Sequence, residues 1–257
     1  VPCQSQRAAL EDVRRLLRPS TVVVNASKGI ELNSLKPMSE VAAEGLGRPG
    51  HFERRYAVLS GPSFAREVVE CKPTAVVLGC ADETLGASLR ELFATTWFRS
   101  YSSTDVRGVE LGGAVKNVIA IAAGVSDGLK FGHNARAALI TRGLAEITRL
   151  GVALGARPST FMGLSGLGDL MLTCAGDLSR NRQVGLGLGR GESLASVIKA
   201  MRTVAEGVKT SAAVYRLAQS LGVDMPITAA MNAVLDGSLS PVEAVRGLMS
   251  RALKEEG

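Results

Sequence analysis

Residues 108–128 read GVELGGAVKNVIAIAAGVSDG, a stretch of small and apolar side chains with a single lysine near its middle. Almost every face of a helix formed here would be apolar, which is typical of a helix that runs through a protein interior. We predict such a helix from Glu110 to Asp127. Lys116 lies inside it and is followed by Asn117. The rest of the chain is interpreted around this segment.

A lysine in an apolar helix requires an explanation, because removing water from an ammonium group is costly or lowers its pKa. Two interpretations of Lys116 remain open from the helix alone. The side chain could reach solvent or pair with an acid in a structural role, or it could serve chemistry in a cleft. Gly112 and Gly113, about one turn earlier, would let another backbone approach this part of the helix.

The composition favours a compact α/β protein. Of 257 residues, 46% are apolar and only 4% aromatic, which favours tightly packed helices and a parallel sheet over a β-sandwich or a disordered chain. The net charge is +6, but the basic residues are spread along the sequence without an aromatic platform. We therefore expect a small phosphorylated or dinucleotide anion as ligand, and no nucleic acid as partner.

The four cysteines have no CxxC spacing, and the sequence contains only two histidines. This pattern predicts neither a metal site nor a disulfide framework and is typical of reduced thiols. No apolar run reaches the roughly 18 residues of a membrane span, and no signal-peptide pattern is present. We expect a cytoplasmic protein without a membrane partner.

The predicted elements divide the chain into two parts. Strand patterns at 21–25, 56–60, 74–79 and 97–102 are separated by helical patterns, which predicts a mostly parallel sheet of βαβ units. After Thr104 only helical patterns are convincing, including a final helix 241–254 capped by Ser240. The predicted fold class is α/β, with a parallel sheet domain over 1–104 followed by an all-α domain over 105–257.

Polar residues follow two of the predicted strands. Lys28 comes just after strand 21–25, and Gly61 and Ser63 come just after strand 56–60. Because ligands of open α/β sheets bind outside the carboxyl ends of strands, these residues are candidates for anion binding. The alternatives are an ordinary charged loop residue for Lys28 and a helix cap for Ser63.

The segment 163–181, GLSGLGDLMLTCAGDLSRN, has the most distinctive local pattern of the helical half. Asp169 and Thr173 would share one face of a helix. The SRN tripeptide at 179–181 offers a hydroxyl, a guanidinium and an amide, which together could grip a phosphate. A helix cap is the alternative for Asp169, and a surface ion pair is the alternative for Arg180.

Six motifs in this order resemble the bacterial NAD(P)-dependent glycerol-3-phosphate dehydrogenases, and the resemblance covers essentially the whole chain. The motifs are SKGIE (27–31), GPSFAREV (61–68), GVELGGAVKNVIAIAAG (108–124), GLGDLMLTC (166–174), SRNRQVG (179–185) and VAEGVKT (204–210). The resemblance implies a partial Rossmann-like dinucleotide-binding domain followed by a helical substrate-binding and catalytic domain.

The family resemblance also implies an activity and roles for individual residues. The activity would be reversible hydride transfer between NAD or NADP and dihydroxyacetone phosphate, giving sn-glycerol 3-phosphate for glycerophospholipid synthesis by a homodimer. Lys116 would be the general acid/base, and the other catalytic residues would be Lys28, Asn117, Asp169 and Thr173. Substrate contacts would come from Lys28, Gly61, Ser63, Lys116, Asp169, Ser179, Arg180 and Asn181. Cofactor contacts would come from Lys28, Ala65, Arg180, Val204 and Glu206.

One family element is missing from this sequence, namely the first strand with its GxGxxG turn, which binds the pyrophosphate. The residues 1–4 resemble the segment after the fourth strand of the family. We therefore expect weakened cofactor affinity and an unpaired sheet edge at 21–25. The glycine-rich residues 185–189, GLGLG, follow no strand, so a flexible loop is expected there rather than a nucleotide-binding turn.

Two alternatives to this assignment remain open at the level of sequence. One is a different dehydrogenase of the 6-phosphogluconate or ketopantoate type. The other is a non-catalytic helical module that keeps the phosphate site without the cofactor half. The preference between NAD and NADP cannot be read from these motifs, because the residue that distinguishes them lies in the missing element.

Overall fold

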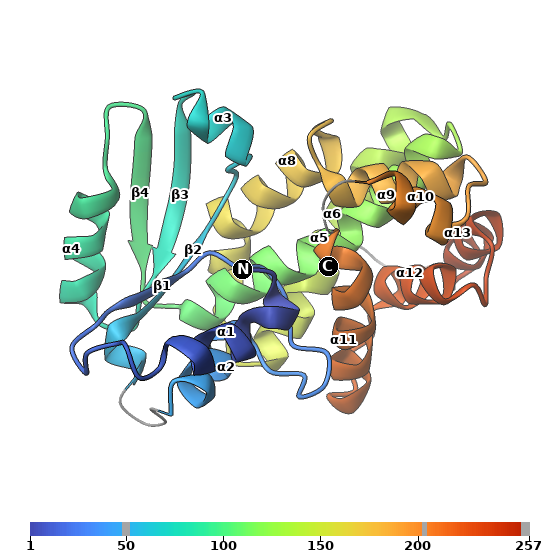
Figure 1. The fold of residues 1–257 in the computed structure, drawn as a ribbon. Coiled ribbons are helices and arrows are strands. Elements are labelled where there is room, and N and C mark those ends of the chain that lie inside the picture. The colour runs from blue at the N-terminus through green and yellow to red at the C-terminus, as the bar shows by residue number, and fades with distance from the viewer. Residues whose placement is uncertain (48–51, 202–204, 253–257) are drawn as a thin grey trace.

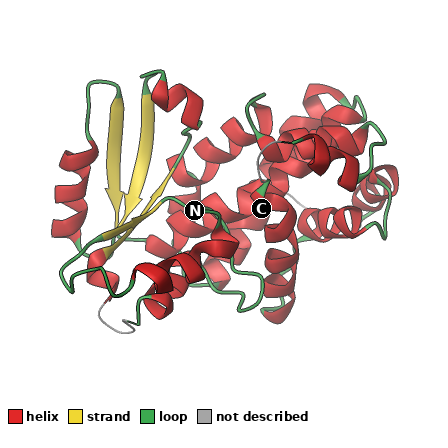
Figure 2. Cartoon of the chain, viewed as in Figure 1, coloured by secondary structure: helices red, strands yellow, loops and turns green. Residues whose placement is uncertain are grey.

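The computed structural model describes residues 1–47, 52–201 and 205–252. A four-stranded sheet lies at one end and a group of helices at the other, as Figure 1 shows. The strands are confined to the sheet end, whereas helices make up nearly all of the other end (Figure 2). This arrangement confirms the predicted fold class, a sheet domain followed by helices.

The sheet has the strand order β1 (Val23–Asn25), β2 (Tyr56–Ser60), β3 (Thr74–Gly79) and β4 (Phe98–Ser103). The pairings β1–β2 and β3–β4 are parallel, so parallel pairing dominates as predicted. The β2–β3 pairing is antiparallel, which sequence patterns did not indicate because alternating side chains do not encode strand direction. Among the described residues β1 pairs only with β2, so it is an edge strand.

Short helices surround the sheet. They are α1 (Gln6–Val13), α2 (Met38–Gly45), α3 (Ala65–Val69) and α4 (Glu83–Phe93), with 3₁₀ turns η1 (Cys3–Ser5) and η2 (Phe52–Arg55). Helix α4 lies against β4 on the outer side of the sheet (Figure 1). Asp82 caps α4 by accepting a hydrogen bond from the N–H of Leu85, which satisfies one of the free amides of the first turn.

Helix α5 (Val106–Gly128) is the predicted central helix, and it is buried from Gly108 to Ser126. It begins at Asp105, whose carboxylate accepts the N–H of Gly108. It packs against β2 and β3 of the sheet as well as against α6, α8, α9, α11 and α12. It is the one helix in the described chain long and apolar enough to cross a membrane, and its apolar window lies wholly inside the protein. Because α5 packs against both the sheet and the other helices, a domain boundary near residue 104 stays a prediction.

The remaining helices surround α5. They are α6 (Gly132–Ala153), α7 (Pro158–Phe161), the π-helical turn η3 (Leu164–Gly168), α8 (Asp169–Ala175), α9 (Arg180–Gly189), α10 (Leu194–Ala200), α11 (Glu206–Ser220), α12 (Pro226–Asp236) and α13 (Pro241–Met249). The predicted cap Ser240 is confirmed and forms a capping box with Glu243. Helix α13 ends earlier than predicted, since Ser250 follows it as the C-cap.

The prediction of a flexible loop at 185–189 is wrong, because these residues form the second half of α9. The helix packs on α5 with almost no side chain between the two backbones. A Cβ atom added at Gly185 would lie 1.9 Å from the carbonyl oxygen of Ile121, and one at Gly124 would lie 2.0 Å from that of Arg182. Glycines spaced four apart on both helices therefore permit direct backbone contact.

Candidate active site

Lys116 is buried in a group of charged side chains that three separate segments bring together. Its Nζ donates to Asp169 Oδ1 at 2.6 Å and to Thr173 Oγ1 at 2.6 Å. Lys28 Nζ donates to the other carboxylate oxygen of Asp169 at 2.7 Å. Asp169 opens α8 and Thr173 lies one turn later, so the predicted shared face of that helix is what reaches Lys116.

The lysine pair is unequally buried. The Lys116 side chain is 7% exposed and that of Asp169 2%, whereas Lys28 retains 20%. Burial is the largest influence on Lys116 and the Lys28 cation is the next; both lower its pKa, while Asp169 opposes them, and the result is a pKa of about 8. Lys116 therefore holds its proton less tightly than a lysine in water does.

The end of β1 places Lys28 at this site. Asn25 Oδ1 accepts the N–H of Ser27 at 3.0 Å, and this side-chain turn redirects the chain just beyond the strand. The stem of Lys28 then crosses α5 at Gly113, where an added Cβ would lie 3.4 Å from Lys28 Cγ. The prediction that Lys28 lies past the carboxyl end of a strand is confirmed.

The loop after β2 contributes a backbone acceptor. The carbonyl oxygen of Gly61 accepts Lys28 Nζ at 3.2 Å and Ser63 Oγ at 3.0 Å. The cap alternative for Ser63 is wrong, because α3 has Phe64 at its N-cap position and no side-chain cap. Ala65 is the first residue of that helix. Gly61 and Ser63 therefore lie beside Lys28, at the same end of the sheet.

The SRN residues form the start of α9. Ser179 caps the helix by accepting the N–H of Arg182, and Asn181 Oδ1 accepts the N–H of Gly207 in α11 at 3.0 Å. A Cβ added at Gly207 would lie 2.9 Å from the carbonyl oxygen of Asn117. The first turn of α9 is thereby held, through Gly207, at the level of the Lys116–Asn117 pair on α5.

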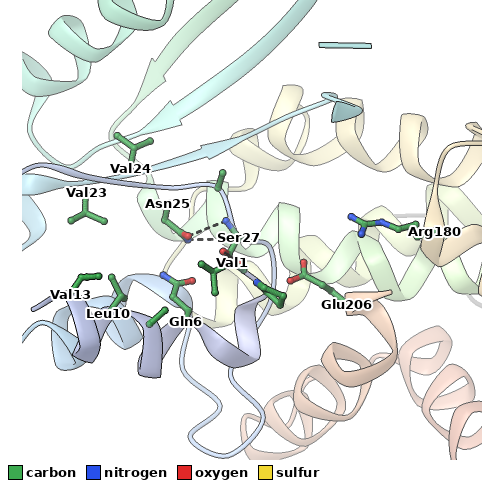
Figure 3. Close-up of a pocket in the computed structure, with 13 residues that line it drawn as sticks. Val1, Gln6, Leu10, Val13, Val23, Val24, Asn25, Ser27, Arg180 and Glu206 are labelled. Atoms are coloured by element: carbon green, nitrogen blue, oxygen red, sulfur yellow. Dashed lines mark hydrogen bonds between the residues drawn. The ribbon is translucent and has the colours of Figure 1, made fainter. Parts of the chain in front are cut away.

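A cavity of about 690 Å³ opens at the carboxyl end of β1. Figure 3 shows Arg180 and Glu206 on one side of it, with the guanidinium of Arg180 directed toward the cavity. The other lining residues are Val1 and Pro2, side chains of α1 and β1, and Ala26 and Ser27 just after β1. Glu206 also accepts the N–H of Cys3 at 2.9 Å. Val204, the remaining predicted cofactor residue, lies outside the described residues.

The cavity fits part of a dinucleotide. Its volume is within the range typical of ligand pockets, and its position outside the carboxyl end of a parallel strand is where nucleotides bind in this type of sheet. The exposed Arg180 at its border supplies a cation for a phosphate. Its mostly aliphatic lining and the Arg180 cation therefore suit a part of NAD or NADP, although no glycine-rich phosphate turn is among the lining residues.

Two groups of polar side chains were not identified from the sequence, one around Arg182 and one around Glu110. Arg182 in α9 binds Asp127 of α5 and Asp177, and Glu110 is fully buried against Tyr56 and Ser39. A sequence signal did exist for the contact between Arg182 and Asp127. The glycines spaced four apart in α5 and in α9 predict that these two helices pack closely. No sequence signal links Glu110 to partners 54 and 71 residues away.

The cysteines of the chain are all free thiols. Cys174 lies one residue after Thr173 and is buried in α8. Burial raises the pKa of the Cys174 thiol to about 12, so this thiol stays protonated and is a poor nucleophile. The described residues contain no cluster of side chains suited to a metal ion.

Comparison with known proteins gives matches along nearly the whole chain. Residues 1–86 match the family described as NAD-dependent glycerol-3-phosphate dehydrogenase N-terminus, and residues 105–246 match its C-terminus. The glycerol-3-phosphate dehydrogenase (NAD(P)+) of Oleidesulfovibrio alaskensis is 65% identical over 256 residues, which cover 100% of this chain and 77% of the relative. The enzyme of the same name from Lawsonia intracellularis is 61% identical, and the match covers 100% of this chain and 71% of that relative.

A solved structure agrees with these sequence matches. The crystal structure of glycerol-3-phosphate dehydrogenase from Coxiella burnetii superposes with a TM-score of 0.91 at 40% identity, covering 98% of this chain and 75% of that one. The fold, the order of motifs and the relatives all point the same way. The chain belongs to the NAD-dependent glycerol-3-phosphate dehydrogenase family.

Proposed function

We propose that this chain interconverts dihydroxyacetone phosphate and sn-glycerol 3-phosphate with NAD or NADP, using Lys116 as general acid/base. The observation that carries the proposal is the buried Lys116, with a pKa of about 8, bonded to Asp169 and Thr173 beside Lys28. A structural lysine would need only a partner, whereas this one also has a second cation next to it. The two sequence alternatives are not favoured, because curated relatives more than 60% identical bear the same enzyme name.

The proton chemistry follows from this geometry. NAD(P)H, when bound, supplies the hydride that reduces the carbonyl carbon of dihydroxyacetone phosphate. Lys116, in its ammonium form, donates a proton to the carbonyl oxygen and becomes a neutral amine that solvent reprotonates. In the reverse direction the amine accepts the proton of the C2 hydroxyl. Asp169 and Thr173 hold Nζ in one place throughout, so the proton is delivered from a fixed direction.

The first turn of α9 provides a site for the substrate phosphate. Arg180 and Arg182 both lie there, although the helix dipole disfavours cations at an N-terminus. Asp127 and Asp177 neutralise Arg182. Arg180 is exposed and makes no ion pair with any described residue. Its charge and the free amides of the first turn therefore favour an anion.

Asn181 and Ser63 would orient the remainder of the substrate. Asn181 Oδ1 is occupied by Gly207, which leaves its amide Nδ2 as the donor for a substrate oxygen. The Ser63 hydroxyl donates to the carbonyl oxygen of Gly61, which also accepts the Lys28 amine. That amine in turn pairs with the carboxylate of Asp169. In this proposal Ser179 acts through its cap on α9, and Asn117 through its position beside Lys116.

The cofactor would lie in the cavity at the end of β1. Arg180 and Glu206 line this cavity, and Lys28 follows its border at Ser27. Ala65, at the start of α3, would contact the cofactor from the sheet side, and Val204 is assigned the role by family resemblance alone. The rates of NADH and NADPH oxidation with dihydroxyacetone phosphate decide between the two cofactors.

The cellular setting is also proposed from the family resemblance. The product would serve glycerophospholipid synthesis in the cytoplasm, in keeping with the four free thiols. A homodimer is supported by large apolar side chains exposed on the helical half, Met162 and Met171 among them. We expect neither nucleic acid nor membrane as a partner.

The test is NADH and NADPH oxidation by the purified chain with dihydroxyacetone phosphate, compared with ketopantoate and with 6-phosphogluconate in the oxidative direction. Lys116→Ala should lower kcat by about 10² to 10⁴, the usual contribution of a positioned acid/base, while circular dichroism remains native. Lys199→Ala, at an exposed position of α10, is the matched control and should keep full activity. Near-normal turnover of Lys116→Ala would remove this lysine from the mechanism.

A further inference from the structure

Arg182 has an environment that is unusual for a residue in the first turn of a helix. It is 9% exposed, and three of its guanidinium nitrogens are bonded. Nε and Nη2 lie 2.9 Å and 2.7 Å from the same oxygen of Asp127, and Nη1 lies 2.8 Å from Asp177. It is not among the residues that line the cavity at β1.

Burial of an arginine at a helix N-terminus is unfavourable in two ways. The helix dipole repels the cation, and removing the guanidinium from water costs free energy that only well-formed partners offset. Leucine or methionine at this position would avoid both costs. The side chain at 182 must therefore do something that an apolar one cannot, which is to hold a carboxylate at a fixed distance and angle.

The carboxylate that it holds belongs to the catalytic helix. Asp127 lies in the last turn of α5, the helix that carries Lys116. Arg136 of α6 also bonds to Asp127, at 3.1 Å. Close glycine contacts join α9 to α5 directly after Arg182, so the ion pair and the glycines together determine how the first turn of α9 sits. That turn begins at Arg180, two residues before Arg182.

We infer that Arg182 is a positioning residue for the substrate phosphate, acting through Asp127 to fix the first turn of α9 and hence Arg180 relative to Lys116. The inference rests on the phosphate site of the proposed function. It predicts a defect confined to the phosphate end of the substrate. Proton transfer by Lys116 should be unaffected, because Arg182 contacts neither Lys116 nor Asp169.

The first experiment measures binding rather than turnover. Calorimetric titration of sn-glycerol 3-phosphate into the chain, with and without NAD+, should show a dissociation constant about tenfold higher for Arg182→Lys, since small displacements of a binding group are costly. The matched control is Arg7→Lys. Arg7 also bonds two carboxylates, Glu31 through Nε and Nη2 and Glu44 through Nη1, but lies on α1. It should leave the dissociation constant unchanged.

The second experiment separates positioning from a general structural effect. For Arg182→Lys, KM for dihydroxyacetone phosphate should rise about tenfold, whereas kcat/KM for unphosphorylated dihydroxyacetone should stay at the wild-type value. The limb of the pH profile near 8 should not move. Asp127→Asn keeps the side-chain shape and should reproduce the phosphate-specific defect, so it replaces Arg182→Lys if that variant does not fold.

Two results would overturn the inference. One is an equal loss for the phosphorylated and unphosphorylated ketones, and the other is the same change in Arg182→Lys and Arg7→Lys. If the wild-type chain binds sn-glycerol 3-phosphate without turnover, the proposed function fails and the binding experiment still decides the role of Arg182. If it turns over and Arg182→Lys binds normally, the inference alone fails.

Discussion

At the scale of single residues, the decisive feature is one carboxylate shared by two ammonium groups. Asp169 accepts Lys116 through one oxygen and Lys28 through the other. The sequence identified all three residues, but it could not give the direction of the pKa shift of Lys116. That direction depends on burial and on distances between groups 53 and 141 residues apart along the chain, which no local pattern encodes.

The shared carboxylate leads to a prediction about pH. In wild type, kcat/KM for ketone reduction should fall as pH rises through about 8, because Lys116 then loses the proton that it donates. Lys28→Met removes a cation that lowers the pKa of Lys116. The carboxylate of Asp169 then pairs with Lys116 only. The falling limb should therefore move to higher pH, even though the overall rate declines. A pH–rate profile measures the limb, and a limb that stays in place or moves down would contradict the electrostatic role of Lys28.

At the scale of elements, the contact of α5 with α9 sets the geometry of the site. The sequence predicted α5 from Glu110 to Asp127 because its apolar run is long, which misses the first turn, from Val106. It also placed Asp169 and Thr173 on one helix face. It failed at 185–189, where glycine was interpreted as flexibility. Glycine has low helix propensity in isolation, but here the backbone contact with Ile121 overrides propensity. Spacing of four residues, rather than glycine content, was the informative signal.

Gly185→Ala tests the importance of this contact. Its Cβ would lie 1.9 Å from a backbone carbonyl oxygen, which no rotamer change can relieve, so the two helices must separate. We expect a loss of about 1–3 kcal/mol or more in the free energy of unfolding, together with weaker sn-glycerol 3-phosphate binding. Both can be measured by urea denaturation and calorimetry.

The control for this substitution is Gly247→Ala in α13, where no atom lies within 4 Å of the added Cβ. Alanine there should be neutral or stabilising by about 0.5–1 kcal/mol. Equal behaviour of the two alanine variants would mean that α9 can move away from α5 at little cost, and that the glycine contact does not define the site.

At the scale of the whole molecule, α5 connects the sheet to the helices. Glu110 in its second turn accepts Tyr56 Oη of β2 at 2.7 Å, and also the backbone N–H and hydroxyl of Ser39 in α2. Burial raises the pKa of Glu110, and these hydrogen bonds only partly oppose it. Sequence patterns predicted both halves but not this junction, because its residues are isolated polar positions in otherwise apolar elements.

The junction predicts that the two halves unfold together. Trp97 is the only tryptophan and directly precedes β4, so its fluorescence reports the sheet, while far-ultraviolet ellipticity reports mainly the helices. The two denaturation curves of the wild type should coincide, as expected for one cooperative unit. Tyr56→Phe removes a hydrogen-bond donor from the buried carboxylate of Glu110. The free energy of unfolding should fall by about 1–3 kcal/mol, and the midpoints of both curves should fall together.

Tyr101→Phe is the control for the tyrosine variant, because Tyr101 is 45% exposed and the guanidinium of Arg99 lies over its ring. Its midpoints should equal those of the wild type. If Tyr56→Phe lowered the fluorescence midpoint and left the ellipticity midpoint in place, the sheet would be unfolding separately from the helices. Lys28, which the sheet carries, would then be held near Lys116 and Asp169 only while both halves are folded, and activity should be lost at the lower of the two midpoints.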